Sequence, residues 1–294
     1  MSLPDATNAA GKRWLSAWKR TGGGGVSQPG RLRLRLSARA WAALAPWVLP
    51  ALLVAGWEAA SEAGLIEARI LPAPSAVATA FWENAKSGAL FHHAGVSTAR
   101  ALTGLVIGGS IGFVLGVLNG ASRTAEALSD STLQMLRNVP HLAIIPLVIL
   151  WFGIEEEAKI FLVAIGVFFP IYLNTLHGIR TVDKGLIEMA KVYGLSQSAL
   201  FYRVTLPGAL PSILVGLRYS LGIMWLTLIV AETISASAGI GYMTMNAREF
   251  LQTDVVLLGV LIYAALGKLA DVLTRALERR ALAWHPSYQP LAEA

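Results

Sequence analysis

The chain has 294 residues, of which 55% are hydrophobic and 14% are charged, and its mean hydropathy is +0.56. Soluble domains carry about 25% charged residues, so this composition excludes disordered, collagen-like and coiled-coil proteins and indicates a membrane protein. Without cysteine the chain has no disulfide, thiolate zinc site or iron–sulfur cluster. Since each membrane helix needs about 20 residues, the length allows five or six spans.

Residues 1–40 carry eight Lys and Arg residues against one acid, together with a Gly22–Gly25 run and Pro29. This composition predicts a flexible basic arm on the cytoplasmic side. A cleaved signal peptide fits less well, because the arm is too long and Trp57 and Glu58 follow the apolar run where small residues are needed. A nucleic-acid role for the arm is less favoured still.

The rest of the chain predicts an all-α, polytopic fold with about six membrane spans. Pro140 and Pro146 break the third span, and Pro170 lies inside the fourth. Between the first two spans, a Pro-x-Pro run precedes a surface amphipathic helix around 77–82. The domain limits are then 1–40 for the arm, 41–284 for the membrane domain and 285–294 for a cytoplasmic tail. The expected spans are 41–60, 101–119, 133–152, 160–176, 213–231 and 255–273.

The distribution of positive charge predicts the orientation of these spans. With the amino terminus inside, the inner flanks hold seventeen Lys and Arg residues and the outer flanks hold five, Arg100 and Lys159 among them. Positive charge collects on the cytoplasmic side of membrane proteins. Both termini are therefore expected in the cytoplasm.

Five glycines recur every four residues in the second expected span. This spacing places them on one stripe of a helix, where another helix can approach backbone to backbone. The partner helix could belong to the same subunit or to a second copy. The stripe consists of Gly104, Gly108, Gly112, Gly116 and Gly120.

The sequence contains no pattern for phosphate binding, zinc-dependent hydrolysis, calcium binding or a serine nucleophile. His92 and His93 form a bare pair without further ligands at metal-binding spacing, so we expect no metal site. We therefore expect no enzyme activity and no cofactor in this chain. Transport through it would be passive, driven by an ion gradient, or powered by another subunit.

The segment between the fourth and fifth spans is far longer than a connection requires. Over 183–211 it predicts a short helix at 186–193, a stop at Gly194, a second short helix and a Leu-Pro-Gly run. Two short helices joined at a glycine form a rigid knob that suits the groove of a partner protein. An ordinary pair of interfacial helices is the alternative reading.

This segment resembles the EAA motif of bacterial ABC importer permeases, and the similarity extends from about residue 70 to residue 288. In that family the loop docks on a cytoplasmic ATPase, which would carry the ATP and Mg²⁺. Met189 departs from the family, which usually has alanine there. The residues that match the motif are Glu188, Ala190, Gly194, Leu206 and Pro207.

Other stretches resemble the sulfonate, taurine and nitrate group of these permeases. They are 69–74, 136–147 and 225–233, and the runs 137–141 and 246–254 are most similar to aliphatic sulfonate permeases. The resemblance implies a type I importer permease in the bacterial inner membrane, with two copies lining one path. Its partners would be a cytoplasmic ATPase, a periplasmic sulfonate-binding protein and membrane lipid. Taurine, nitrate or another small anion is the alternative substrate.

Polar residues in the third expected span could line a path for an anion. Arg137, Asn138 and His141 lie within little more than one helical turn, near two prolines that free backbone carbonyls. Ionisable residues are costly inside a membrane and therefore point to function. Alternatively, Arg137 lies at the cytoplasmic interface and braces its helix through Glu126 or Asp130.

Two other classes of protein fit the sequence less well than a permease. A gradient-driven secondary carrier needs paired buried acids or a sodium site, whereas Glu58 and Glu232 both lie near span ends. Glu232, at the outer end of the fifth span, is better suited to pair with a cation beside the path. A membrane-embedded enzyme needs clustered catalytic residues, which the sequence does not contain.

Overall fold

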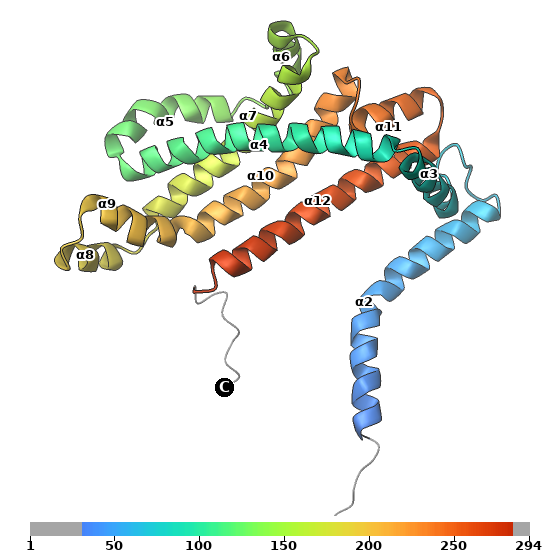
Figure 1. Cartoon of the computed structure of the whole chain (residues 1–294), viewed down its shortest axis with the longest axis horizontal. Helices are drawn as coiled ribbons and strands as arrows, with labels where there is room; N and C mark the ends of the chain where they lie inside the picture. Colours follow the sequence, from blue (N-terminus) through green and yellow to red (C-terminus); the bar gives the residue numbers. More distant parts are fainter. Residues whose placement is uncertain (1–30, 285–294) are drawn as a thin grey trace, which may run out of the picture. The chain divides into compact units, whose positions relative to one another are not determined.

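The structure, a computed structural model, describes residues 31–284, and all of its regular elements there are helices (Figure 1). The residue contacts divide the chain into two units, 1–57 and 58–294. Helix α2 (Arg31–Glu62) contains Pro46 and Pro50 and includes the first expected span. It begins within the stretch expected as the basic arm; the rest of that arm and the expected tail lie outside the described residues.

Four helical segments of the described chain are long and apolar enough to cross a membrane. They are α4 (Ala89–Ala121), α7 (Glu156–Arg180), the continuous segment Gln197–Ile234 that contains most of α10 (Leu206–Ser235), and α12 (Thr253–Ala281). These cover the second, fourth, fifth and sixth expected spans. Each extends beyond its predicted limits, because the helix continues into less apolar residues past its apolar centre.

The third expected span is two helices in the structure. α5 (Arg123–Arg137) is amphipathic and contains no buried residue, and α6 (Ile145–Phe152) is a separate eight-residue helix. The break predicted at Pro140 is present, because proline lacks the amide hydrogen that helix propagation needs. Pro146 lies in the first turn of α6, where proline is tolerated, so it does not form the second break.

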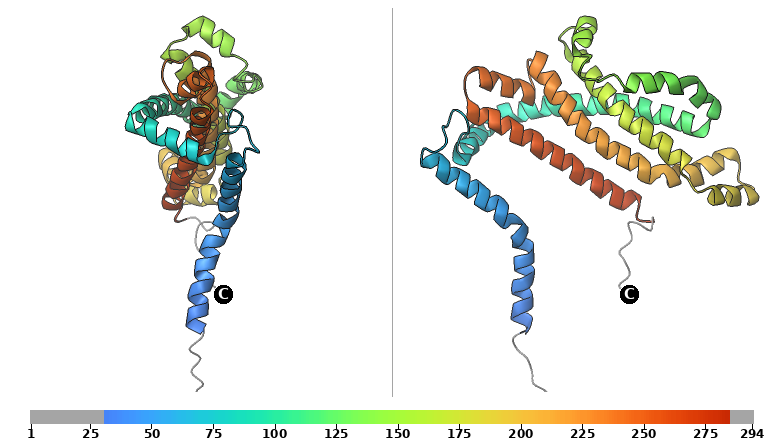
Figure 2. Two further views of the ribbon diagram at one scale, coloured as in Figure 1. Left: turned by 90° about the vertical axis from the view of Figure 1, so that its right-hand side faces the viewer. Right: turned by 180° about the vertical axis from the view of Figure 1, so that it is seen from behind.

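The remaining short helices lie at the two ends of the long ones (Figures 1 and 2). α3 (Pro74–Lys86), which includes the expected amphipathic helix, and α11 (Ile240–Glu249) lie at one end. α8 (Lys184–Val192), α9 (Gln197–Leu200) and a π-helical turn at Phe201–Thr205 lie at the opposite end. The long helices therefore connect two separate groups of short helices.

The glycine stripe of α4 packs along α7 within the same subunit. A Cβ atom at Gly108 would overlap the backbone carbonyl oxygen of Ala164, and one at Gly112 would lie 2.6 Å from the carbonyl oxygen of Phe168. The other three glycines of the stripe also face residues of α7. Only glycine permits this backbone-to-backbone approach.

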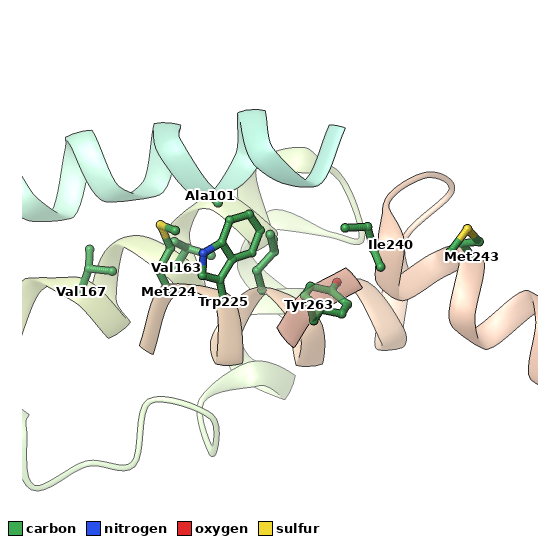
Figure 3. Close-up of a cluster of buried hydrophobic side chains, with 9 residues drawn as sticks. Ala101, Val163, Val167, Met224, Trp225, Ile240, Met243 and Tyr263 are labelled. Carbon is green, nitrogen blue, oxygen red and sulfur yellow. The ribbon is translucent and has the colours of Figure 1, made fainter. Parts of the chain in front are cut away.

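A buried apolar cluster joins α4, α7, α10, α11 and α12 beside this contact. Figure 3 shows Trp225 and Met224 of α10 beneath Ala101 of α4, with Tyr263 of α12 nearby. Further residues from α7 and α11 complete the cluster, among them Val163, Val167, Ile240 and Met243. The packing joins five helices in one buried core.

Candidate functional site

The segment 183–211 forms the rigid helix–glycine–helix unit that its sequence predicts. Asp183 caps the start of α8 by accepting a hydrogen bond from the Gly185 amide at 2.7 Å. At the other end the Gly194 amide donates to Lys191 and the Leu195 amide donates to Ala190, which is a Schellman stop. Gly194 has φ +76°, a left-handed conformation that favours glycine.

The motif residues take different positions within this unit. Ala190 is buried against the rest of the unit, whereas Glu188 and Gly194 are exposed. Leu206 and Pro207 form the first turn of α10, directly after the π-helical turn, so the unit is joined to a long membrane helix without an intervening loop. α9, the π-helical turn and α10 are therefore one continuous helical segment.

The outward side of the unit is apolar although it lies at a helix end. Val192 is 86% exposed and Tyr193 is 78% exposed, and Met189 and Leu186 are also exposed. Tyr202 of the π-helical turn adds a further exposed ring. Exposed apolar residues that are gathered at one site indicate a binding surface. We call this surface, comprising Leu186, Met189, Val192, Tyr193 and Tyr202, the α8 surface.

At the opposite end, Arg100 and Glu232 form a buried ion pair between α4 and α10. The Arg100 Nη1 atom lies 2.8 Å from the Glu232 Oε1 atom, and the two side chains are 4% and 0% exposed. Arg100 also binds Glu156 at the start of α7 through two contacts of 2.5 Å. Its remaining contact is with the carbonyl oxygen of Ala238.

Further hydrogen bonds saturate the Glu232 carboxylate. It accepts from Ser97 Oγ at 2.8 Å, from Tyr263 OH at 2.9 Å and from the Gly241 amide at 2.9 Å. Ser97 also accepts from the Ile240 amide. We call these groups the outer network, after the end of the fifth span at which the sequence predicts Glu232. The outer network connects α4, α7, α10, α11 and α12. Glu232 pairs with a cation as expected, and that cation is an arginine of the chain itself.

The position of Arg100 differs from the sequence prediction. It was counted in an outer flank because the second span was expected to start at residue 101, whereas α4 starts at Ala89 and places Arg100 within the helix. Lys159 is likewise inside α7 and buried, where it donates to the carbonyl oxygens of Ile154 and Glu155. Gly88, which directly precedes α4, was the sequence signal that this helix starts well before Arg100.

The other residues expected along the path separate in the structure. Arg137 ends α5 and is exposed, Asn138 follows it and is also exposed, and His141 is half-buried in the turn before α6. His141 Nε2 lies 3.1 Å from Thr227 Oγ1 of α10. Within the described residues, Arg137 forms no ion pair, so bracing through Glu126 or Asp130 is absent.

Glu126 instead pairs with Arg180 and joins the start of α5 to the end of α7. The hydrogen bond from the Arg180 guanidinium lowers the pKa of the Glu126 carboxyl below its ordinary value, with the charges of Arg180 and Arg123 adding to the effect. This contact lies at the same end of the long helices as α8 (Figure 1).

A polar cavity of about 490 Å³ opens at the end that carries α3 and α11. Glu83 of α3 and Asp254 of α12 are its charged residues at neutral pH, and amide, hydroxyl and imidazole groups add polar lining. His93, in its wall, accepts a hydrogen bond from the Gly239 amide at 3.2 Å. Since Gly239 lies against Glu232, the cavity wall contacts the outer network.

Comparison with known proteins places this architecture in a family. Residues 108–282 match the family described as the inner membrane component of binding-protein-dependent transport systems, which is more than half of the chain. The chain belongs to this family. It is a multi-pass inner-membrane permease, the membrane subunit of an ABC transporter. Membership of this family excludes the alternative of a gradient-driven secondary carrier. Family membership implies a cytoplasmic ATPase and a binding protein as partners.

Curated relatives cover nearly the same length. The permease is 62% identical over 245 residues to the protein SsuC of Escherichia coli strain K12, and the match covers 83% of this chain and 93% of the relative. It is 47% identical over 242 residues to SsuC of Bacillus subtilis strain 168, and this match covers 82% of the chain and 88% of the relative. Both relatives are named for aliphatic sulfonate transport. The taurine transport permease TauC of Escherichia coli K12 is 36% identical, covering 81% and 89%.

A solved structure shares the fold. The crystal structure of an amino acid ABC transporter with histidines matches 64% of this chain and 92% of the solved chain, with a TM-score of 0.53 and 18% identity. The sequence-based prediction of an importer permease fold is confirmed.

Proposed function

We propose that this permease carries aliphatic sulfonates across the inner membrane as part of an ATP-driven importer. The observation that supports this most strongly is the 62% identity, over 83% of the chain, to a relative named for aliphatic sulfonate transport. The 36% identity to the taurine permease makes taurine the second candidate. In either case the imported compound would supply sulfur to the cell.

In this proposal two copies of the permease line one path, and an ATPase binds the α8 surface of each copy from the cytoplasm. Both termini then lie in the cytoplasm, and α3 and α11 face the periplasm. The opposite placement of α8 and α11 supports this arrangement, because one end is free for each partner (Figure 2). Glu188, Ala190, Gly194, Leu206 and Pro207 form and anchor the ATPase contact.

The binding protein would dock on the periplasmic end, at the polar cavity formed by α3, α11 and the adjoining helix ends. Its docking would act on α11, whose amides bind Ser97 and Glu232 of the outer network. The ATPase would act on α10 through α8 and α9. α10 carries both Glu232 and Thr227, so the two inputs meet on one helix. Arg137, Asn138 and His141 are proposed to line the path between them.

Growth and uptake together test the substrate. Deletion of the gene, in a strain without a second sulfonate system, should abolish growth on ethanesulfonate as sole sulfur source and leave growth on sulfate intact. The transporter reconstituted with its ATPase and binding protein should import labelled ethanesulfonate, with stronger competition from unlabelled ethanesulfonate than from taurine or nitrate. Uptake of taurine or nitrate without uptake of ethanesulfonate would overturn the sulfonate assignment.

A further inference from the structure

An apolar pocket of about 410 Å³ lies between α7, α6 and the turn that precedes α6. Its walls are aliphatic and aromatic, with Ile144 and Leu147 on one side and Phe161, Ile165 and Phe168 on the other. These α7 residues lie between the start and the middle of a helix that is long and apolar enough to cross a membrane. The pocket is therefore walled in part by a membrane-length helix.

One basic residue lies in the wall of this apolar space, and a second lines a neighbouring cavity. His141 forms part of the pocket wall, and Thr227 is its hydrogen-bond partner. On the other side of Phe169, which borders both spaces, a second cavity of about 50 Å³ is lined by Arg137, Gln134 and Asp130. The carboxylate of Asp130 accepts from Gln134 at 3.4 Å, whereas Arg137 has no ion-pair partner in the part of the chain that the structure describes.

We propose that this pocket holds the alkyl chain of a sulfonate during its passage, while Arg137 and His141 attract the sulfonate group. The proposal rests on the proposed function and adds to it a site in the permease itself that senses alkyl chain length. An alkanesulfonate has a charged end and an apolar end. The pocket offers an apolar environment, and the cavity that shares Phe169 with it offers the Arg137 guanidinium.

The histidine favours a transported ligand over a lipid chain as the occupant. Polar and ionisable residues inside a membrane face the interior of the protein or a water-filled cavity, because contact with lipid leaves them unsatisfied. His141 is held toward the core by Thr227, which is fully buried in α10. α10 also joins α8 and α9 to the outer network. The occupant of the pocket would therefore lie beside the helix that the partner proteins move.

The test measures binding to the permease–ATPase complex without the binding protein, so that recognition by that partner does not contribute. Saturation-transfer NMR with the alkanesulfonates from ethanesulfonate to hexanesulfonate would give the dependence on chain length. Burial of one methylene contributes about 0.8 kcal/mol, so affinity should rise about fourfold for each added carbon until the pocket is full. Arg137→Gln should weaken every member of the series by a similar factor.

Three variants locate the effect. Ile165→Trp, which fills the pocket, should remove the gain for the longer chains, so that hexanesulfonate binds no more tightly than ethanesulfonate. Ile165→Ala, which enlarges the pocket, should shift the chain length of tightest binding to longer alkanesulfonates. This variant keeps the proposal testable if Ile165→Trp does not fold. Leu150→Trp is the matched control, because Leu150 is 79% exposed and is not part of the pocket.

A series that does not depend on chain length, or that responds equally to Ile165→Trp and Leu150→Trp, would overturn the proposal. So would a phospholipid retained in the wild-type complex and lost from Ile165→Trp, with no alkanesulfonate bound. In these outcomes the complete transporter can still import ethanesulfonate, which separates failure of the pocket from failure of the proposed function. Failure of the proposed function would instead remove sulfonate uptake altogether.

Discussion

Arg100 and Glu232 are 132 residues apart in the sequence, and their side chains meet in the interior at 2.8 Å. The pair joins the first half of α4 to the last turn of α10. It is surrounded by hydrogen bonds from Ser97 and Tyr263, so both charges are compensated. A buried charge that loses its partner is strongly destabilising, which makes this pair a point of high sensitivity.

Arg100→Met should therefore destabilise the permease severely, by about 3–5 kcal/mol, because the Glu232 carboxylate would be left buried without its cation. The measurement is thermal unfolding of the purified transporter in detergent. Arg275→Met is the matched control: Arg275 pairs with Asp271 on an exposed face of α12, and solvent screens such pairs so that they add little stability. Equal losses in the two variants would contradict the prediction.

The double variant Arg100→Met with Glu232→Gln refines this result. It removes both charges, so the stability should recover part of the loss seen for Arg100→Met alone. If the double variant were instead less stable by the sum of the single effects, the two residues would not be coupled.

Gly108→Ala tests the contact between α4 and α7. The added methyl group would overlap a backbone carbonyl of Ala164, which cannot move aside as a flexible side chain can, so the helices must separate. Assembly and folding yield should fall sharply. Gly95→Ala, in the same helix, is the control: its Cβ meets nothing within 4 Å, and alanine favours a helix over glycine by about 1 kcal/mol. Fluorescence-detected size-exclusion chromatography of both variants gives the comparison.

The absence of cysteine from the sequence allows a direct test of orientation and coupling. Val192→Cys and Leu65→Cys introduce single thiols at positions that are 86% and 80% exposed, near opposite ends of the long helices. A membrane-impermeant maleimide should label Leu65→Cys in intact cells and Val192→Cys only after the membrane is opened. Val192→Cys should crosslink to the ATPase. The reverse pattern of labelling would invert the proposed topology.

Much of this architecture follows from local sequence, and the rest depends on tertiary contacts. The helix–glycine–helix unit over 183–211 was predictable because its signals act on neighbouring residues. Asp183 caps the start of α8, Gly194 ends it in a left-handed conformation, and Pro207 favours the start of α10. The helix that packs against the glycine stripe was not predictable, because the same spacing suits a partner helix in the same subunit or in a second copy. The network around Glu232 was also missed, because its members are far apart in the sequence and Arg100 was taken for a surface charge.

The proposed binding-protein site predicts an effect of charge. Glu83→Gln together with Asp254→Asn would remove the carboxylates of the polar cavity and keep polar groups of similar shape; asparagine can still accept from the Val255 amide that Asp254 binds at 2.9 Å. Stimulation of ATPase activity by the loaded binding protein should then require several-fold more of that protein. Glu249→Gln, which changes an exposed acid of α11 outside the cavity, should have no such effect.

The Glu126–Arg180 pair predicts a dependence of local stability on pH. Pairing holds the folded-state pKa of Glu126 below its ordinary value of 4.5, so its stabilising contribution is complete at higher pH. It is lost as the pH falls through the folded-state pKa, because protonation removes the charge that Arg180 binds. Hydrogen exchange in the first turns of α5 should accelerate in that acidic range. Glu126→Gln should show the faster exchange already at neutral pH, without this additional acid-dependent step. Asp130→Asn, in the same helix but outside the pair, is the control and should retain the wild-type response to pH.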